Sequence, residues 1–190
     1  METVSATDHG QLQRARNSDQ TPTFPTAYWP ISPELVPHCP AKTLGFLSGL
    51  ADVVGNETDH ATGSTTFTVN YRNRDVSKHI ADKTGIPSRT VDRRLVEIAQ
   101  LPGVTVTYAD TSDRLTITLP AIEGTRRPQV PKGTGLSGRA LRVWLALQLA
   151  RRTDSIAKVA KALGCSPDTI TRGESELVKA GLLALSLIHI

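Results

Sequence analysis

The chain of 190 residues has room for one or two small domains, and its formal net charge of +4 makes it mildly basic. No stretch approaches the roughly 18 apolar residues of a membrane span, and no secretory hydrophobic region is recognised, so we expect no membrane contact. The two cysteines, Cys39 and Cys165, indicate neither a disulfide framework nor a zinc site. We therefore expect a cytoplasmic, nucleoid-associated protein.

Positive charge is concentrated in the later part of the chain. Residues 1–71 carry three basic and seven acidic side chains, a net charge of −4, so the remainder carries +8. A localised positive region suits the DNA backbone, because phosphates that it neutralises release their counterions. A merely solvated surface is the alternative interpretation of the same charges.

The first 40 residues differ from the rest in composition. They are polar and then rich in proline, which favours a disordered or loosely docked N-terminal arm over 1–40. The cluster from Tyr28 to Ile31 is the exception, because its apolar area is large enough to dock on a domain.

From residue 41 onward, helical and strand patterns follow one another. Apolar spacing predicts a helix over 41–54, and threonine with aromatic and β-branched residues predicts a short strand over 66–71. A second helix is expected from Asp75, a suitable N-cap, to Gly85, and a third over 88–100. Two alternating runs, 104–108 and 115–119, predict a two-stranded hairpin.

One small motif occurs twice with identical internal spacing, 79 positions apart. An alanine that permits close helix crossing precedes a glycine that ends the helix, and a β-branched aliphatic residue follows the glycine by six places. The two sets are Ala81, Gly85 and Val91, and Ala160, Gly164 and Ile170. This is the pattern of a helix-turn-helix, whose second helix lies in the DNA major groove.

The order helix, strand, helix, helix, hairpin over residues 41–120 resembles the winged helix-turn-helix superfamily of bacterial or phage type. A linker over 121–136, with Arg126 and Arg127 able to lie along DNA, leads to a long helix over 137–152 and the second motif copy. The resemblance implies a second winged helix domain over 137–184 with an incomplete wing. The expected fold class is mainly α with small β wings (α+β), as tandem winged helix-turn-helix domains. Residues 185–190 resemble the translated end of a sequencing adapter, and a native apolar strand after Gly181 is the alternative interpretation.

The candidate DNA contacts of the first copy lie on its second helix. Arg89 and Arg93 are the predicted base readers, Ser88 and Thr90 are predicted phosphate contacts, and Arg94 extends the same surface. The alternative is that these arginines are solvated or paired with acidic residues of their own helix.

The second copy repeats the threonine and the arginine but carries fewer cations. Ser166 is expected as the N-cap with Pro167 at the first helical position, and weaker or less specific binding is predicted. The candidate contacts are Ser166, Thr169, Thr171 and Arg172, with Lys158 and Lys161 on the preceding helix. Further phosphate contacts are expected from Arg72, Arg74 and Lys78. Arg114 at the hairpin tip is a candidate for a minor-groove contact, but Asp110 and Asp113 beside it favour the alternative of a structural turn.

The leading hypothesis is a transcriptional regulator that binds double-stranded DNA sequence-selectively. A plasmid or phage replication initiator, or a replisome loader, is the alternative, and a protein-interaction module is the third. A homodimer and a partner protein of replication or transcription are left open. We expect no enzyme, cofactor or metal, because His38 and Cys39 lack an orienting group and no metal-ligand or nucleotide-binding spacing is present.

Overall fold

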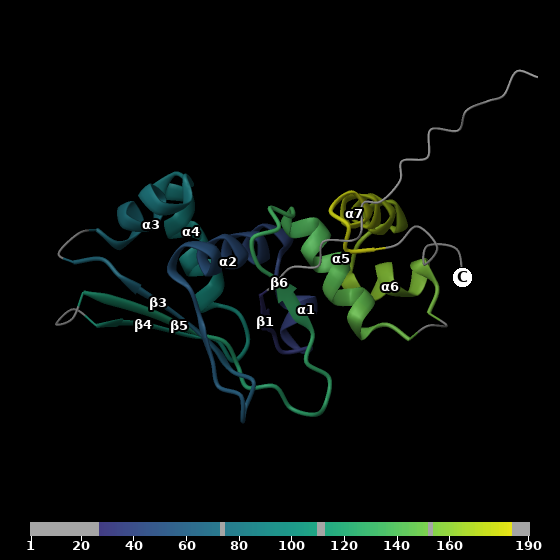
Figure 1. Cartoon of the computed structure of the whole chain (residues 1–190), viewed down its shortest axis with the longest axis horizontal. Helices are drawn as coiled ribbons and strands as arrows, with labels where there is room; N and C mark the ends of the chain where they lie inside the picture. The colour runs from purple at the N-terminus through teal and green to yellow at the C-terminus, as the bar shows by residue number, and fades with distance from the viewer. Residues whose placement is uncertain (1–26, 73–74, 110–112, 152–153, 184–190) are drawn as a thin grey trace, which may run out of the picture.

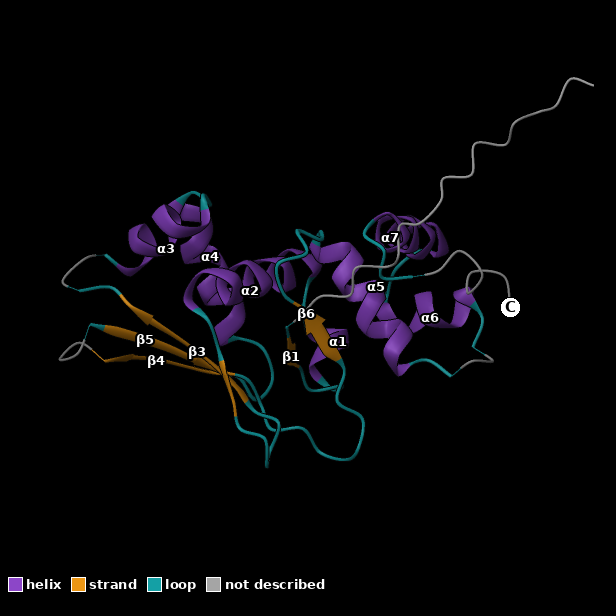
Figure 2. Cartoon of the chain, in the orientation of Figure 1, coloured by secondary structure: helices purple, strands orange, loops and turns teal. Residues whose placement is uncertain are grey.

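The computed structural model describes residues 27–72, 75–109, 113–151 and 154–183, which form two lobes along the longest axis of the molecule (Figure 1). The first lobe contains the helices α2 (Ala41–Val54), α3 (Val76–Thr84) and α4 (Ser88–Ala99). Its antiparallel sheet has the strand order β2-β3-β5-β4. The strands are β2 (Glu57–Thr58), β3 (Thr65–Asn70), β4 (Thr105–Ala109) and β5 (Arg114–Thr118). The three helices lie on one side of this sheet (Figure 2).

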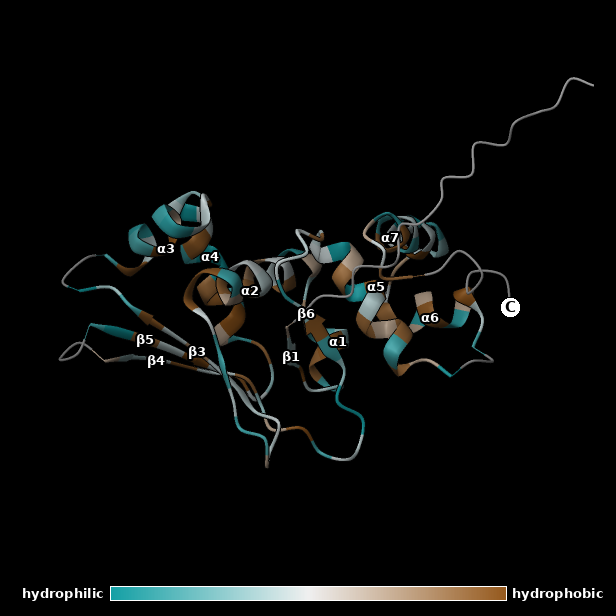
Figure 3. Cartoon of the chain, viewed as in Figure 1, coloured by the Kyte–Doolittle hydropathy of each residue, from teal (hydrophilic) through white to brown (hydrophobic). Residues whose placement is uncertain are grey.

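Residues of the two central strands alternate between the helix-covered face and the open face of the sheet. Phe67, Leu115 and Ile117 are fully buried and supply the core, as period-two alternation requires. The intervening residues are threonines, and Thr66 pairs with Thr118 across the two strands. The hydropathy colouring shows apolar residues both in α2 and in the strands that it covers (Figure 3). The predicted strand and hairpin are therefore confirmed, with boundaries shifted by one residue.

The first helix pair, α3 and α4, has the turn that the motif predicts. Asp75 accepts a hydrogen bond from the backbone nitrogen of Lys78 at 2.8 Å and caps α3. Gly85 ends that helix at φ 71° and ψ 6°, a left-handed conformation that costs glycine little. Val91 of α4 is fully buried against the core.

The second lobe contains α5 (Gly138–Leu149) and the second helix pair, α6 (Ile156–Leu163) and α7 (Pro167–Lys179). Gly164 ends α6 at φ 62°, and Ile170 is fully buried. Ser166 caps α7, with Pro167 at its first position, as expected. The described residues after α7, 180–183, form no strand, and residues 184–190 lie outside the described part of the chain.

Part of the N-terminal segment belongs to the core. The cluster at 28–31 docks, as its apolar area allows, whereas the expected disordered or loosely docked arm is wrong for residues 32–39, where Leu35, Val36 and Cys39 are also buried. Strand β1 (Tyr28–Pro30) pairs antiparallel with β6 (Gln129–Pro131), which lies inside the expected linker. Helix α1 (Leu35–His38) follows. Trp29 has no exposed surface and meets Phe67 edge to face, with ring centroids 5.3 Å apart. The rest of the expected arm, residues 1–26, lies outside the described residues.

The two lobes meet where α2 crosses α5. A Cβ atom added to Gly138 would lie 1.7 Å from the carbonyl oxygen of Ala41 and 3.0 Å from the nitrogen of Gly45. The helix backbones are therefore in direct contact, and one continuous apolar cluster runs through both lobes. The chain is thus an α+β protein with helices in both lobes and two small antiparallel sheets.

Cys39, one of the two cysteines, is part of this core. Burial raises the pKa of its thiol to about 12, although the guanidinium of Arg142 acts in the opposite direction. The thiol is therefore protonated at neutral pH and packs as a small apolar group.

Candidate nucleic-acid interface

The outer face of α4 carries a continuous stripe of exposed side chains. Arg89, Arg93, Val96 and Gln100 follow one another at intervals of four, three and four residues, which places them on one side of a helix. All four are exposed, whereas Val91 and Ile98 on the opposite side have no exposed surface. Within the described part of the chain, neither Arg89 nor Arg93 forms an ion pair. Two guanidinium groups are thus available on one exposed helix face.

Arg94 does not extend this face, so its assignment to the interface is wrong. Its position three residues after Val91 turns it inward, and only 7% of its surface is exposed. The guanidinium contacts the carboxylate of Glu97, which also accepts a hydrogen bond from Thr43 Oγ1 of α2 at 2.7 Å. These two bonds lower the pKa of Glu97, the bond from Thr43 being the larger cause. Arg94 therefore helps to fix α4 against α2.

Asp92 projects from α4 beside the arginines, but its carboxylate is engaged elsewhere. Its Oδ1 accepts a hydrogen bond from Ser77 Oγ of α3. The bond ties the two helices of the first pair together, and it points this carboxylate at α3.

Ser88 and Thr90, the predicted phosphate contacts of the first pair, lie in the first turn of α4. Both are half-buried. The backbone nitrogen of Thr90 bonds to the carbonyl of Pro87 at 2.7 Å. The two hydroxyl residues flank Arg89 in the sequence, and serine and threonine hydroxyls are among the groups that bond to DNA phosphates.

The second helix pair presents its candidate residues differently. Arg172 forms an ion pair with Asp168 at 2.9 Å, and both side chains are 67% exposed. Ser166 and Thr169 bond to each other at 3.0 Å as part of the N-cap, and Thr171 Oγ1 donates to the Pro167 carbonyl at 3.3 Å. An exposed ion pair such as that of Arg172 with Asp168 contributes about 0.2–1 kcal/mol to stability, so a stronger partner of Arg172 can replace it. The face of α7 is nevertheless less cationic than that of α4.

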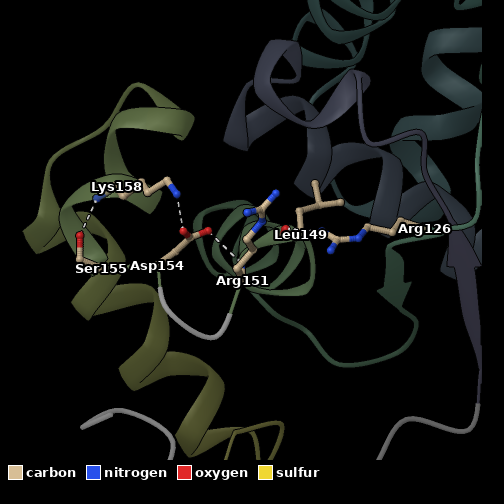
Figure 4. A network of polar contacts seen from close by, with 6 residues as sticks. All are labelled: Arg126, Leu149, Arg151, Asp154, Ser155 and Lys158. Carbon is tan, nitrogen blue, oxygen red and sulfur yellow. Dashed lines mark hydrogen bonds and ion pairs between the residues drawn. The ribbon is translucent and has the colours of Figure 1, made fainter.

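Lys158 and Lys161 of α6 also differ in their surroundings. Lys158 forms an ion pair with Asp154, and Asp154 Oδ2 accepts a bond from the backbone nitrogen of Arg151 at 2.8 Å (Figure 4). The bond from Lys158 is the main reason that the pKa of Asp154 is lowered. Lys161 is exposed and forms no ion pair with another described residue.

The remaining candidate cations surround the first helix pair. Arg72 and Lys78 are exposed near the start of α3, and Arg74 lies outside the described residues. Arg72 also lines an open depression of about 520 Å³ between α2, β3 and α3, together with His79 and Lys83. Arg114 is exposed beside the hairpin tip and donates to Asn70 Oδ1 at 3.4 Å.

Two exposed apolar side chains near this surface were missed by the sequence interpretation. Val96 on α4 is 58% exposed and Tyr108 on β4 is 50% exposed. Val96 lies three residues after Arg93, so helical spacing alone could have identified it. An aliphatic side chain at such a position can contact the methyl group of thymine.

The inner face of α7 contains a buried glycine and a buried glutamate, Gly173 and Glu174. A Cβ atom on Gly173 would lie 2.5 Å from Val143 Cγ2 of α5, which explains a glycine inside this helix. Glu174 beside it is buried, and its Oε2 has no hydrogen-bond partner among the described residues. Burial raises the pKa of this carboxyl group.

Replacing Glu174 by glutamine is expected to stabilise the fold at neutral pH by on the order of 1 kcal/mol, because the variant no longer buries an ionised group without a partner. The pKa of Glu174 is higher in the folded chain than in the unfolded chain. This group therefore favours folding most at a pH below its unfolded pKa, and that contribution to stability is lost as the pH rises through its folded pKa. Urea unfolding at pH 4 and at pH 7.5 measures the effect. Glu174→Gln should have a higher free energy of unfolding than the wild type only at the higher pH. An equal increase at both pH values would contradict the prediction. Asp82→Asn, which removes an exposed carboxylate, controls for net charge.

None of the helices in the described part of the chain is long and apolar enough to cross a membrane. The comparisons with known proteins give no match: no family model, no curated protein and no solved structure is significantly similar to the chain.

Proposed function

We propose that the chain binds double-stranded DNA with sequence preference, through α4 as the main reading helix and α7 as a weaker second contact, and that it regulates transcription. The observation that carries the proposal is the exposed face of α4, where Arg89 and Arg93 form no ion pair with any described carboxylate. Arginine side chains in this setting suit bidentate hydrogen bonds to guanine.

The architecture around α4 supports the same proposal. Helix α2, strand β3, the pair α3 and α4, and the hairpin of β4 and β5 follow in the order of a winged helix, with β5 between β3 and β4 in the sheet. In that arrangement the second helix of the pair enters the major groove, and the hairpin contacts the flanking backbone. The exposed cations Arg72 and Lys78 lie near the start of α3, where a phosphate backbone would pass.

Arg93→Ala is the direct test of this reading role. Sites enriched from random duplex DNA are expected to bind the wild-type chain with a steep salt dependence, and the variant should bind them about 5 to 150 times more weakly, the equivalent of about 1–3 kcal/mol. Fluorescence anisotropy with labelled duplexes measures both quantities. The matched control is Arg151→Ala, which removes an exposed arginine that follows α5 in the second lobe and does not lie on α4.

The outcome separates a reading role from a general electrostatic one. An effect of Arg93→Ala that is confined to the enriched site indicates base contact, whereas equal weakening on all duplexes indicates phosphate contact. Absence of duplex binding at low salt would overturn the proposal and favour a protein-interaction module.

Replication initiation is the second candidate, because two helix pairs in one chain suit repeated sites at an origin. Enriched sites that recur in a tandem array, together with recruitment of a helicase, would favour initiation over regulation. An enriched site that lies singly at a promoter would favour the regulator.

A further inference from the structure

The segment between the two lobes is bonded to both of them. Strand β6 is paired with β1 through Trp29 and Val130, and neither side chain of this pair has exposed surface. The Pro30 carbonyl accepts a bond from Thr65 Oγ1 of β3 at 2.9 Å, which joins the two-stranded sheet to the first lobe. Trp144 Nε1 of α5 donates to the Gln129 carbonyl at 2.7 Å, which joins it to the second.

Two adjacent arginines of the expected linker bond to opposite lobes. Arg126 donates to the Leu149 carbonyl at the end of α5 at 2.8 Å (Figure 4). Arg127 donates to the carbonyl of His60 at 3.0 Å, in the loop before β3. The two arginines thus connect the linker to both lobes. Their guanidinium groups donate to protein carbonyls, whereas the sequence interpretation had them lying along DNA.

A third connection lies at the crossing of α2 and α5. The backbone of Gly138 contacts the backbone of α2 directly, so no side chain separates the two helices at this point. Close backbone contact leaves α2 and α5 little room to slide past each other. Nearby, Arg142 Nη2 of α5 donates to the Leu163 carbonyl at the end of α6 at 3.0 Å. Helix α5 therefore binds the first lobe on one side and α6 and α7 on the other.

We infer that the two helix pairs form one rigid reader, so that the duplex it fits carries two contact segments at one set spacing and one set helical phase. This inference rests on the proposed function. Figure 1 places α3 and α4 at one end of the long axis and α7 at the other, both toward the same edge of the view, with α2 and α5 between them. A tethered pair of domains would accept several spacings, because a flexible linker adapts its length. A rigid reader accepts one.

The test uses the full chain and a duplex that carries the enriched site. Base pairs are inserted between the two contact segments, in steps up to one full helical turn of about ten base pairs. Half-turn and full-turn insertions should each reduce affinity by on the order of 100-fold, because the second contact and its avidity are lost in both. The matched control places the same insertions outside the contact segments, where affinity should stay constant. Recovery of affinity at the full turn would overturn the inference, since only independent domains can follow the shift.

A second measurement decides the point without DNA. Spin labels on Ala99→Cys of α4 and Lys179→Cys of α7, in a Cys165→Ser background, report the distance between the helix pairs. A single narrow distribution in the free chain is expected, and a broad one would overturn the rigid coupling. If the distribution is narrow and no duplex binds, the proposed function fails while the coupling stands.

Discussion

Gly138→Ala is expected to destabilise the fold by about 3 kcal/mol or more. The added Cβ would lie 1.7 Å from the Ala41 carbonyl oxygen and 2.6 Å from its carbon. Both atoms are backbone, so no rotamer change relieves the overlap and the two helices have to move apart. Alanine in a helix would otherwise gain up to about 1 kcal/mol over glycine, and the clash outweighs this gain. Chemical unfolding followed by circular dichroism measures the loss.

Two glycines of α2 provide matched controls. A Cβ on Gly49 of α2 meets nothing within 4 Å, so Gly49→Ala should stabilise the chain by about 0.5–1 kcal/mol. A Cβ on Gly45 would lie 3.3 Å from the Gly138 nitrogen, so Gly45→Ala should fall between the two. A Gly138→Ala variant as stable as Gly49→Ala would show that α2 and α5 do not cross at this distance.

Trp29→Ala is expected to cost about 3–5 kcal/mol, the range for removing a large buried aromatic side chain. Trp29 has no exposed surface, and its ring contacts that of Phe67 in the first lobe. The same change would cost little if residues before 40 only rested on the surface. Guanidinium unfolding measures the difference, and a loss under about 1 kcal/mol would contradict the core position of this segment.

Trp29→Phe is the matched variant. It keeps an aromatic ring against Phe67 and removes the Nε1 donor, which has no hydrogen-bond partner among the described residues. It should therefore lose less stability than Trp29→Ala. Equal losses would mean that the complete indole, and not an aromatic ring alone, is what the site requires.

Local patterns predicted the elements of both helix pairs to within a few residues. Asp75, Gly85 and Ser166 occupy the cap positions that their chemistry favours, because capping depends on neighbours three or four residues away. The inward position of Arg94 was also available from its spacing to Val91. The alternative in which arginines of α4 pair with acidic residues of their own helix is confirmed for Arg94 and Glu97, which lie three residues apart. The part that sequence spacing does not give is the bond from Thr43 of α2 to the same carboxylate, because it depends on how the two helices pack.

The relation between the lobes could not be predicted in this way. Strand β1 pairs with residues about a hundred positions later, and prolines hide its periodicity. The reason for Gly138 and Gly173 is equally non-local, since each faces a different helix. On the candidate interface, Arg89 and Arg93 of α4 are exposed as the motif predicts, but the ion pair that engages Arg172 depends on side-chain conformation.

The pairing of Trp29 with Val130 also sets the order of events during synthesis. A nascent chain that has emerged from the ribosome only as far as the hairpin contains the residues of every strand of the larger sheet. It does not yet contain β6, the partner of β1. The pairing of β1 with β6 can then form only after residues 129–131 have emerged. Because it closes so long a loop, we expect this pairing, and with it the final packing of Trp29 against Phe67, to be a late step of folding. Fragments cut at residue 120 would stop at the same stage and expose apolar surface, so the lobes are poor candidates for separate expression.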